Sequence, residues 1–491
     1  MSELCLEPAH RLIDRLRQRE VSALELLEQH AARLAQLNPP LNAVVATNLD
    51  AARARAREAD AATARGESWG PLHGLPMTIK DTLEVAGMPT TAGAPALKDH
   101  RPKHNAPAVQ RLLDAGAIVF GKTNVPLYGG DVQSFNKVYG TTRNPWNLER
   151  TPGGSSGGAA AALAAGLTPL ELGSDIGGSI RTPAHFCGVY GHKPSYGIVP
   201  VRGHIPGPPG TVSEADMSVV GPLARSAEDL ALALSIVAGP IAPAANGWRL
   251  ELPAPRPTSL RDYRIHAWLD DPACPVDAAV RPVLEQALEK LRQHGCQVTT
   301  GAPQGFALDE LYALYFALLG AVFSGGLPEK VYRRAQRAGV VAAWFGRNRV
   351  NTLPGFLGHA TLSHRLWLRL NEQRERLRLK FEALFQTCDV LLMPVTRTTA
   401  PPHTQDGDVY SRLLTVNGHA EPYATQFNWI APATVAGLPA TSAPVGRAAD
   451  GLPVGLQIVG ACLHDRTTID FARQLAALTG GFSPPPERSR Q

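Results

Sequence analysis

Residues Thr151–Ser195 read TPGGSSGGAAAALAAGLTPLELGSDIGGSIRTPAHFCGVYGHKPS, and they organise the interpretation of the whole chain. Two serine-bearing glycine loops lie in this stretch, at Gly153–Gly158 and Asp175–Ser179, joined by the alanine-rich segment Ala159–Ala165. Each glycine held in a regular element costs conformational entropy. Glycines gathered around serine therefore indicate a backbone that approaches a reacting atom closely, and we expect the two loops to form a site.

The composition of the chain is that of a globular protein long enough for a large core. It has 491 residues and a formal net charge of +5. No basic stripe with interleaved aromatic residues occurs, so the charge pattern does not indicate a nucleic-acid partner. The six cysteines are scattered and form no C-x-x-C pair, which argues against a zinc site or a disulfide framework. We expect reduced thiols and a cytoplasmic protein.

The N-terminus and the apolar segments carry no targeting signal that we can identify. The opening residues MSELCLEPAH lack the basic and apolar regions of a signal peptide. The longest apolar candidate is Leu311–Phe323, which is shorter than the about 20 residues of a membrane span. We therefore expect no transmembrane segment, and interpret Leu311–Phe323 as a core or pocket-lining helix.

Strand and helix patterns alternate along the chain, which favours an α/β fold. A proline-rich connection, Gly239–Pro257, separates two such regions. Ala400–Tyr423 has the composition of a loop. The other elements that we expect are helices at Asp50–Arg65, Ala106–Ala115, Asp277–His294, Leu362–Phe385 and Thr467–Leu478, and strands at Met77–Lys80, Ala117–Phe120, Tyr263–Leu269, Cys296–Thr299 and Val390–Val395.

Gly116–Thr123 matches the phosphate-loop pattern G-x-x-x-x-G-K-[ST], but its context is wrong. A phosphate loop follows a strand and leaves its backbone N–H groups free for oxygens. Here the middle residues are themselves an apolar strand, so the sequence argues against a nucleotide site.

Gly153–Gly157 matches the nucleophile elbow G-x-S-x-G. That elbow needs a buried strand directly before the serine, whereas Asn144–Pro152 is a polar loop bracketed by prolines. A Ser-His-Asp enzyme built on Ser155 is therefore disfavoured. His185, His192 and His204 follow closely, but no spacing marks one of them as a base, and structural or surface roles are favoured for them.

Three segments together resemble the amidase signature family: Pro76–Asp81 (PMTIKD), Gly153–Gly158 (GGSSGG) and Gly173–Arg181 (GSDIGGSIR). Ser155 precedes Ser179 by 24 residues, which is the family spacing between the first serine of the double-serine loop and the nucleophilic serine. Further similar segments extend to Gly451–Gln457, so the resemblance covers most of the chain. It implies the amidase signature fold, a central mixed β-sheet covered by helices on both faces.

Within this family, the resemblance implies a Ser-cisSer-Lys triad. Ser179 would be the nucleophile, Ser155, with a cis peptide bond before it, would relay the proton, and Lys80 would be the base. A serine hydroxyl needs such a base to become a good nucleophile. A lysine is a base only when neutral, so its pKa must fall from ~10.4, and burial in an apolar strand with Met77 and Ile79 is consistent with that fall.

The resemblance also implies an oxyanion hole made by the backbone N–H groups of Ile176, Gly177, Gly178 and Ser179. Asp175 and Arg181 would brace this loop, with a plain structural ion pair as the alternative. Ser156 would join the same hydrogen-bond network or cap the helix that follows.

By resemblance we expect amide hydrolysis through an acyl-enzyme, with no metal and no cofactor. The main hypothesis is an amidase that acts on acyl or aryl amides. Within the family, the chain resembles bacterial amidases and fatty acid amide hydrolase. The alternatives are the glutaminase (A) component of glutamyl-tRNA amidotransferase and a non-catalytic relative. A glutaminase would need an aspartate where this chain has Phe427, and no acid occurs from Ala424 to Gly437. A small-molecule amide is the expected partner, and a homodimer is the family expectation.

The family architecture implies a single domain over residues 1–491. Its catalytic core would comprise about residues 66–238 and 390–478, and a variable substrate-pocket region about residues 240–390. In that region Leu311–Phe323 and Val340–Phe345 would line an apolar acyl channel or form ordinary core helices. The sequence does not decide between fatty acyl, aryl and short aliphatic amides.

Overall fold

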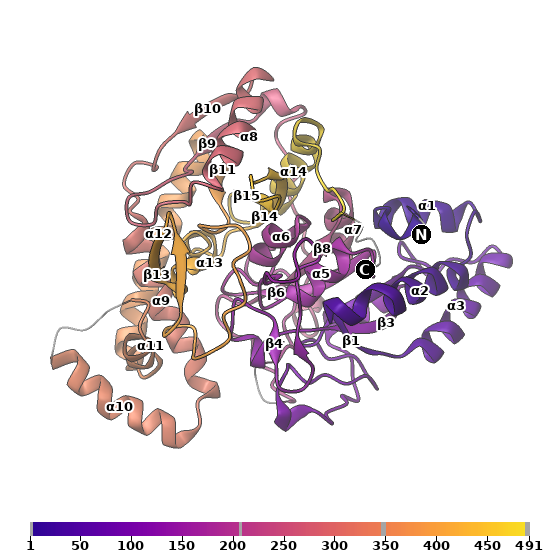
Figure 1. The fold of residues 1–491 in the computed structure, drawn as a ribbon, viewed down its shortest axis with the longest axis horizontal. Helices are drawn as coiled ribbons and strands as arrows, with labels where there is room; N and C mark the ends of the chain where they lie inside the picture. The colour runs from indigo at the N-terminus through magenta and orange to yellow at the C-terminus, as the bar shows by residue number, and fades with distance from the viewer. Residues whose placement is uncertain (1–2, 206–208, 345–349, 487–491) are drawn as a thin grey trace.

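The computed structural model describes residues 3–205, 209–344 and 350–486. At the centre of these residues lies a mixed sheet of eleven strands (Figure 1). In spatial order the strands are β1 (Val44–Thr47), β3 (Ile118–Thr123), β2 (Pro76–Lys80), β6 (Leu170–Asp175), β8 (Val219–Ala224), β7 (Tyr190–Lys193), β14 (Ala440–Arg447), β15 (Pro453–Val459), β11 (Val390–Pro394), β9 (Arg264–Ala267) and β10 (Gln297–Thr300).

Helices flank this sheet, so the predicted α/β fold with a mixed central sheet is confirmed. The N-terminal helices lie at one end of the molecule and α10 at the other (Figure 1). The helices are α1 (Ala9–Arg17), α2 (Ala23–Leu41), α3 (Leu49–Ala64), α4 (Pro107–Asp114), α5 (Gly157–Ala164), α6 (Arg181–Cys187), α7 (Ala227–Val237), α8 (Arg281–Gln293), α9 (Leu308–Phe323), α10 (Glu329–Trp344), α11 (Leu353–Ala360), α12 (His364–Thr387), α13 (Ala431–Val435) and α14 (Asp465–Thr479).

The strand order brings two sequence motifs to one edge of the sheet. Strand β2 lies between β3 and β6 and is parallel to both. Lys80 ends β2 and Asp175 ends β6. In α/β sheets, ligands bind beyond the carboxyl ends of such strands. The pairing of β2 with β6 therefore places Lys80 beside the loop that follows Asp175.

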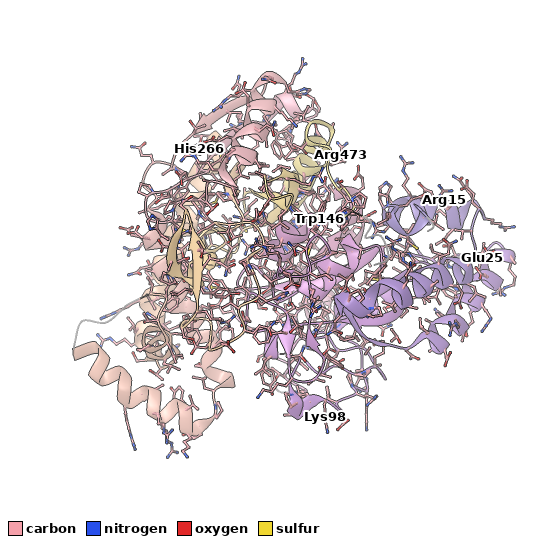
Figure 2. All side chains as sticks on the ribbon, viewed as in Figure 1. Arg15, Glu25, Lys98, Trp146, His266 and Arg473 are labelled. Atoms are coloured by element: carbon pink, nitrogen blue, oxygen red, sulfur yellow. The ribbon has the colours of Figure 1, made fainter. Side chains whose placement is uncertain are left out.

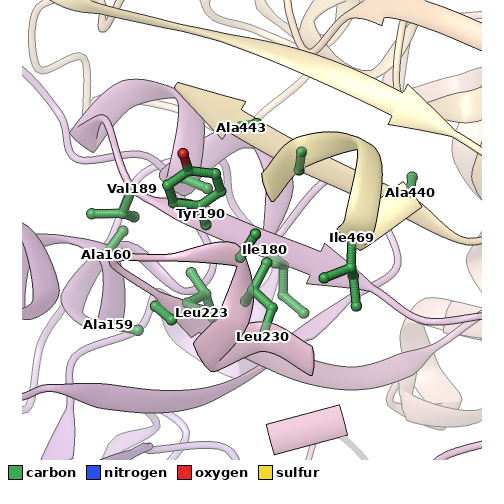
Figure 3. Close-up of a cluster of buried hydrophobic side chains, with 14 of the residues drawn as sticks. Ala159, Ala160, Ile180, Val189, Tyr190, Leu223, Leu230, Ala440, Ala443 and Ile469 are labelled. Carbon is green, nitrogen blue, oxygen red and sulfur yellow. The ribbon is translucent and has the colours of Figure 1, made fainter. Parts of the chain in front are cut away.

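The alanine-rich helix α5 explains how the double-serine loop reaches the same edge. Every residue of α5 is buried, and the helix packs on β2, β6 and β8. Its small side chains let it lie close to the strands, in the hydrophobic cluster that Figure 3 shows around Ala159, Ala160 and Leu223. A side chain at Gly158 would collide with the backbone of Asn124. Close packing of α5 thus fixes Ser155 and Ser156 directly before its first turn.

Two local predictions hold in the structure. Gly116–Thr123 belongs to a strand and not to a phosphate loop, since β3 spans Ile118–Thr123. The Lys122 ammonium is fully buried and donates hydrogen bonds to the carbonyl of Leu83 and to the hydroxyl of Thr90. The described backbone between β5 (Gly140–Thr141) and Ser155 contains no strand. Ser155 therefore does not sit on a strand-to-helix elbow.

The predicted loop Ala400–Tyr423 was wrong in part, because it contains a hairpin of β12 (Leu413–Val416) and β13 (His419–Pro422). Along β12, Leu414 and Val416 are buried while the residues that alternate with them are exposed. This alternation spans only four residues, too short to stand out from the polar sequence around it. The buried pair packs with Val132 and Tyr423, and the backbone of Val132 lies against Gly154 of the double-serine loop.

The apolar helix α9 is longer than the sequence suggested. Together with a 3-10 turn it spans Leu308–Gly326, 19 residues with a mean hydropathy of 1.3, which by length and composition alone is enough to cross a membrane. The expectation that no apolar segment approaches this length is therefore corrected. Half of this window is buried inside the protein, and the helix packs against α11, α12 and α13. The core helix of a soluble protein has the same properties.

Candidate active site

Lys80 lies at the end of a completely buried strand, with its amine beside two serines. All five residues of β2 are buried. The Nζ atom lies 2.7 Å from Ser155 Oγ, 2.9 Å from Ser174 Oγ and 3.4 Å from the Ser174 carbonyl. Burial lowers the pKa of Lys80 to about 7, against the opposing effects of the Asp175 and Glu171 carboxylates. A large fraction of this amine is therefore neutral near neutral pH.

Ser155 follows a cis peptide bond between Gly154 and Ser155, as the family resemblance implies. The loop is packed so tightly that a Cβ at Gly154 would lie 2.5 Å from the Asp131 carbonyl oxygen. The Ser134 hydroxyl donates to the Gly153 carbonyl at 3.0 Å and accepts from the Gly157 N–H at 3.0 Å. These contacts hold the Ser155 hydroxyl over Lys80 and at the wall of a cavity.

Ser179 lines the same cavity as Ser155, on the loop that follows β6. The two loops are joined directly, because the Ser156 N–H donates to the Ser179 carbonyl at 3.1 Å. Among the described residues, none forms a hydrogen bond with the Ser179 hydroxyl, which is thus available to a ligand in the cavity. The residue is only 7% exposed.

The loop around Gly177 and Gly178 presents backbone N–H groups, but one of the four expected donors is already engaged. The Gly178 N–H donates to Asp175 Oδ1 at 2.9 Å. Within the described residues, the N–H groups of the other three expected donors, Ile176, Gly177 and Ser179, have no protein partner, and the oxyanion hole stays a prediction. Gly178 has a φ of +83°, and a Cβ there would lie 2.7 Å from Thr182 Oγ1, so glycine is required for the turn.

Asp175 and Arg181 form a completely buried ion pair that holds this loop. Asp175 accepts from the N–H groups of Ile180 and Arg181 and from two nitrogens of the Arg181 guanidinium. Burial would raise the pKa of Asp175, but the charge and hydrogen bonds of Arg181 lower it to about 2. Arg181 also donates to the Ile430 carbonyl, Gln457 and Thr434. It thereby ties the loop to α13 and β15.

Ser156 occupies the N-cap position of α5 but makes no capping hydrogen bond with its side chain. Its hydroxyl instead lies 3.4 Å from the Ser174 carbonyl, which is also within reach of Lys80. The sequence left two roles open for Ser156, a helix cap or a member of the hydrogen-bond network around Lys80. The contact of its hydroxyl with the Ser174 carbonyl fits the second role better.

The cavity has a volume of about 610 Å³ and a wall of mixed character. Its aromatic and aliphatic wall includes Phe323 from the end of α9 and Trp367 from α12. His364 and Trp367 stack with ring centroids 6.0 Å apart. Its two acidic side chains are both paired: Asp175 with Arg181, and Asp216 with Arg374 at 2.7 Å. Among the described residues that line this cavity, no carboxylate is therefore unpaired.

Phe427, which we expect to be replaced by an acidic residue in a glutaminase, packs on the loop before Ser179. A Cβ at Gly177 would lie 3.2 Å from Cε1 of Phe427 and 3.3 Å from the hydroxyl of Tyr315. The residue at which the sequence predicts an aspartate in a glutaminase thus lies beside the loop that carries Ser179.

A family model described as Amidase matches residues 25–469. The chain belongs to the amidase family. As a member of this family it is an enzyme that acts on amide C–N bonds. Among the residues that the structure describes, no group of three or more His, Cys, Asp or Glu side chains is placed to hold a metal ion.

Curated relatives of this amidase include the A component of the glutamyl-tRNA(Gln) amidotransferase of Synechococcus sp. (strain CC9605), which is 32% identical over 95% of each chain. The same component from Prochlorococcus marinus (strain MIT 9303) is 34% identical over 92% of this chain and 93% of the relative.

Among solved structures, 6-aminohexanoate cyclic dimer hydrolase is 28% identical, with a TM-score of 0.78 over 98% of this chain and 99% of that one. A bacterial aryl acylamidase of the amidase signature family is 25% identical, with a TM-score of 0.81 over 97% of each chain. These likenesses confirm the fold that the sequence predicts.

The structure brings into the candidate site three residues that the sequence did not assign to it, and for one of them, His204, the sequence favoured a structural or surface role. Ser174 contacts Lys80 through both its hydroxyl and its carbonyl. His204 lies 2.8 Å from Ser174 Oγ. Tyr315, on α9, donates to the Ile176 carbonyl at 3.0 Å. Ser174 lies inside a quoted motif, but nothing local to His204 or Tyr315 signals where the fold brings them. The segment Val340–Phe345, considered as a channel wall, lies outside the residues whose side chains are described.

Proposed function

We propose that this amidase hydrolyses uncharged acyl or aryl amides to a carboxylic acid and an amine or ammonia, through an acyl-enzyme on Ser179. The observation that carries the proposal is the Lys80 amine 2.7 Å from Ser155 Oγ, at a cavity that Ser179 also lines. The lowered pKa of Lys80 supports its assignment as the base, since a base must be neutral to accept a proton.

In the proposed cycle, the Ser179 oxygen attacks the amide carbonyl carbon while its proton passes to Ser155. Ser155 passes its own proton to Lys80, which becomes an ammonium. The C–N bond then breaks, and the leaving nitrogen takes a proton back through the same relay as it departs with the electron pair of that bond. Water, deprotonated by the same chain, hydrolyses the ester on Ser179 and restores both serines and the neutral lysine.

The N–H groups of Ile176, Gly177 and Ser179 would stabilise the oxyanion that forms in each half of the cycle. Each donor aimed at a developing oxyanion is worth about 3 kcal/mol of transition-state stabilisation. The Asp175–Arg181 pair supports this role because Asp175 accepts from three backbone N–H groups of the same turn. The turn is thereby fixed before the substrate arrives.

The cavity wall supports an uncharged substrate with an apolar or aromatic group. Phe323, Leu362 and Trp367 offer apolar contact, and both acidic side chains at the wall are neutralised by arginines. A charged group would lose its hydration here without gaining an unpaired partner.

The glutaminase alternative rests on one observation, the 32–34% identity to the amidotransferase A components over more than nine-tenths of the chain. Phe427 opposes it, because its ring packs on the loop before Ser179 where glutamine's ammonium would need an acid. We therefore favour the stand-alone amidase.

A substrate panel tests this choice. We expect the purified chain alone to hydrolyse anilides and long-chain acyl amides and to release no ammonia from glutamine. Glutamine hydrolysis equal to or faster than that of the apolar amides would overturn the proposal in favour of the glutaminase.

The remaining parts of the proposal concern organisation and location. We propose one domain with the catalytic and variable regions predicted from the family, a homodimer in solution, and a cytoplasmic enzyme. All six cysteines are free thiols, five of them buried, which supports a reducing compartment. Sedimentation of the purified chain would measure the oligomeric state.

A further inference from the structure

A chain of polar contacts extends from the Lys80 amine away from Ser155 and ends at His204. The Lys80 Nζ atom lies 2.9 Å from Ser174 Oγ, and Ser174 Oγ lies 2.8 Å from His204 Nε2. Ser174 and His204 both line the active-site cavity. In the described structure, none of the three residues proposed for the reaction itself forms a hydrogen bond with His204. The histidine therefore acts on the hydrogen bonds of the site through Ser174 and Lys80.

His204 is held at this place by the backbone on both sides of it. The residue forms an antiparallel bridge with Leu83, three positions after Lys80. The Glu84 N–H donates to the Gly203 carbonyl at 2.9 Å, and the Ile205 N–H donates to the Thr82 carbonyl at 2.8 Å. The segment that follows the base therefore also positions the histidine.

Counting protons on the neutral amine fixes the direction of these hydrogen bonds. A neutral lysine has two N–H donors and one lone pair. If the lone pair is to take a proton from Ser155, the two N–H groups must point to the remaining acceptors, which are the hydroxyl and the carbonyl of Ser174. The Ser174 hydroxyl then accepts from Lys80 and must send its own proton to the other atom within reach, His204 Nε2.

We propose that His204 is a positioning residue that accepts the Ser174 hydroxyl proton and so keeps the Lys80 lone pair directed at Ser155. The inference rests on the proposed role of Lys80 as the base. Without the histidine acceptor, the Ser174 hydroxyl turns its proton toward the Lys80 lone pair and competes with Ser155 for it. The amine then remains present but points its lone pair at the wrong serine.

The surroundings of His204 favour the neutral ring that this role requires. Burial and the neighbouring charge of Lys80 lower the pKa of His204 to about 3. Lys80 on β2 is the group whose charge acts on His204, while Asp175 and Glu171 on β6 act on Lys80. A neutral imidazole carries one acceptor nitrogen, and the proton count on Lys80 and Ser174 gives that role to Nε2 in the proposal.

Four variants of the full-length enzyme test the proposal, assayed for kcat, KM and the pH dependence of kcat/KM on one amide substrate. His204→Leu removes the acceptor, and we expect kcat to fall about 10- to 100-fold, less than when a base itself is removed, with KM unchanged. A hydrogen bond donated to the neutral amine favours that form. The acid limb of the pH profile therefore moves to lower pH in His204→Leu.

His204→Gln keeps a side-chain carbonyl as acceptor, and we expect it to recover most of the lost kcat and the original acid limb. Ser174→Ala removes the hydroxyl through which His204 acts. The double variant His204→Leu/Ser174→Ala should therefore be no slower than Ser174→Ala alone. His266→Leu, on β9 near the other end of the sheet and at the edge of the molecule in Figure 2, is the control for loss of a histidine.

Wild-type kcat and an unmoved acid limb in His204→Leu would overturn the proposal, as would additive losses in the double variant. If circular dichroism shows that His204→Leu does not fold, His204→Gln decides. An acid limb at the wild-type pH supports the role of His204, and an acid limb at another pH contradicts it. Failure of the proposed function is a different result. In that case the enzyme lacking the Lys80 amine would remain active, whatever the behaviour of the His204 variants.

Discussion

The Nζ atom of Lys80 lies 2.7 Å from Oγ of Ser155, although 75 residues separate the two in the chain. The parallel pairing of β2 with β6 and the close packing of α5 on both strands create this contact. The amine is completely buried, and it is surrounded by hydroxyl and carbonyl oxygens rather than by a close carboxylate partner. A lysine in such a place is costly to keep charged, which suits it to accept a proton.

Replacing Lys80 by methionine keeps the side-chain volume and removes the amine. We expect kcat/KM for an amide substrate to fall by about 10²- to 10⁴-fold, because general-base assistance to Ser155 and Ser179 is lost. Lys98→Met is the matched control, since Lys98 is exposed (Figure 2) and should keep wild-type activity. A Lys80→Met enzyme within a few-fold of wild type would remove lysine from the mechanism.

The pH dependence of the reaction follows from the lowered pKa of Lys80. The neutral fraction of the amine grows as pH rises through about 7, so kcat/KM should rise over the same range and then level off. A lysine with an ordinary pKa would place that rise near ~10.4. The lowered pKa also affects the free energy of unfolding. Between about pH 7 and pH ~10.4 Lys80 is neutral in the folded chain but protonated in the unfolded chain. The unfolded chain therefore binds more protons, and the contribution of Lys80 makes stability rise with pH over this range. A rate profile that is flat from pH 5 to 9 would disagree with a lysine base.

Breaking the buried pair of Asp175 and Arg181 should destabilise the protein strongly, because it leaves a buried charge without its partner. Asp175→Asn leaves the completely buried Arg181 guanidinium without its counter-charge, and breaking such a pair costs about 3–5 kcal/mol in the free energy of unfolding. Urea unfolding measures the change. Glu372→Gln removes an ion pair of 3.2 Å whose side chains are 63% and 74% exposed, and should cost less than about 1 kcal/mol. Equal losses in the two variants would contradict the bracing role.

Trp367 lines the cavity and should select for large apolar substrates. We expect Trp367→Ala to lower kcat/KM by about 10- to 100-fold for an amide with a bulky apolar group, from the loss of apolar burial. A small amide such as acetamide should change little. Trp248→Ala is the control, because Trp248 is 48% exposed and does not line the cavity. A uniform loss for small and large amides would place Trp367 outside the substrate contacts.

The sequence predicted the parts of the site that lie within short motifs. Ser155 and Ser179 stand in glycine- and serine-rich segments, and Lys80 stands in the segment PMTIKD; the resemblance of these segments to the amidase signature family is readable without a structure. The cis bond before Ser155 was implied by the same resemblance and is present. The strand nature of Gly116–Thr123 was predicted from the apolar residues of that segment and is present as well.

The parts that the sequence did not predict depend on distant contacts. His204 reaches Ser174 because its backbone bridges to Leu83, and Tyr315 reaches the Ile176 carbonyl from a helix in the variable region. Nothing in the residues next to either one indicates that placement. The engagement of the Gly178 N–H by Asp175 was missed for a related reason, since the direction of a backbone N–H in a tight turn requires its dihedral angles.

The most direct test of the account is the identity of the residue that carries the acyl group. We expect intact-mass and peptide analysis, after reaction with a fluorophosphonate or an acid quench during turnover of an ester or anilide, to place the adduct on Ser179. Ser179→Ala should abolish both the adduct and turnover, whereas Ser235→Ala, at an exposed serine, should change neither. An adduct on Ser155, or turnover that persists in Ser179→Ala, would contradict the central claim.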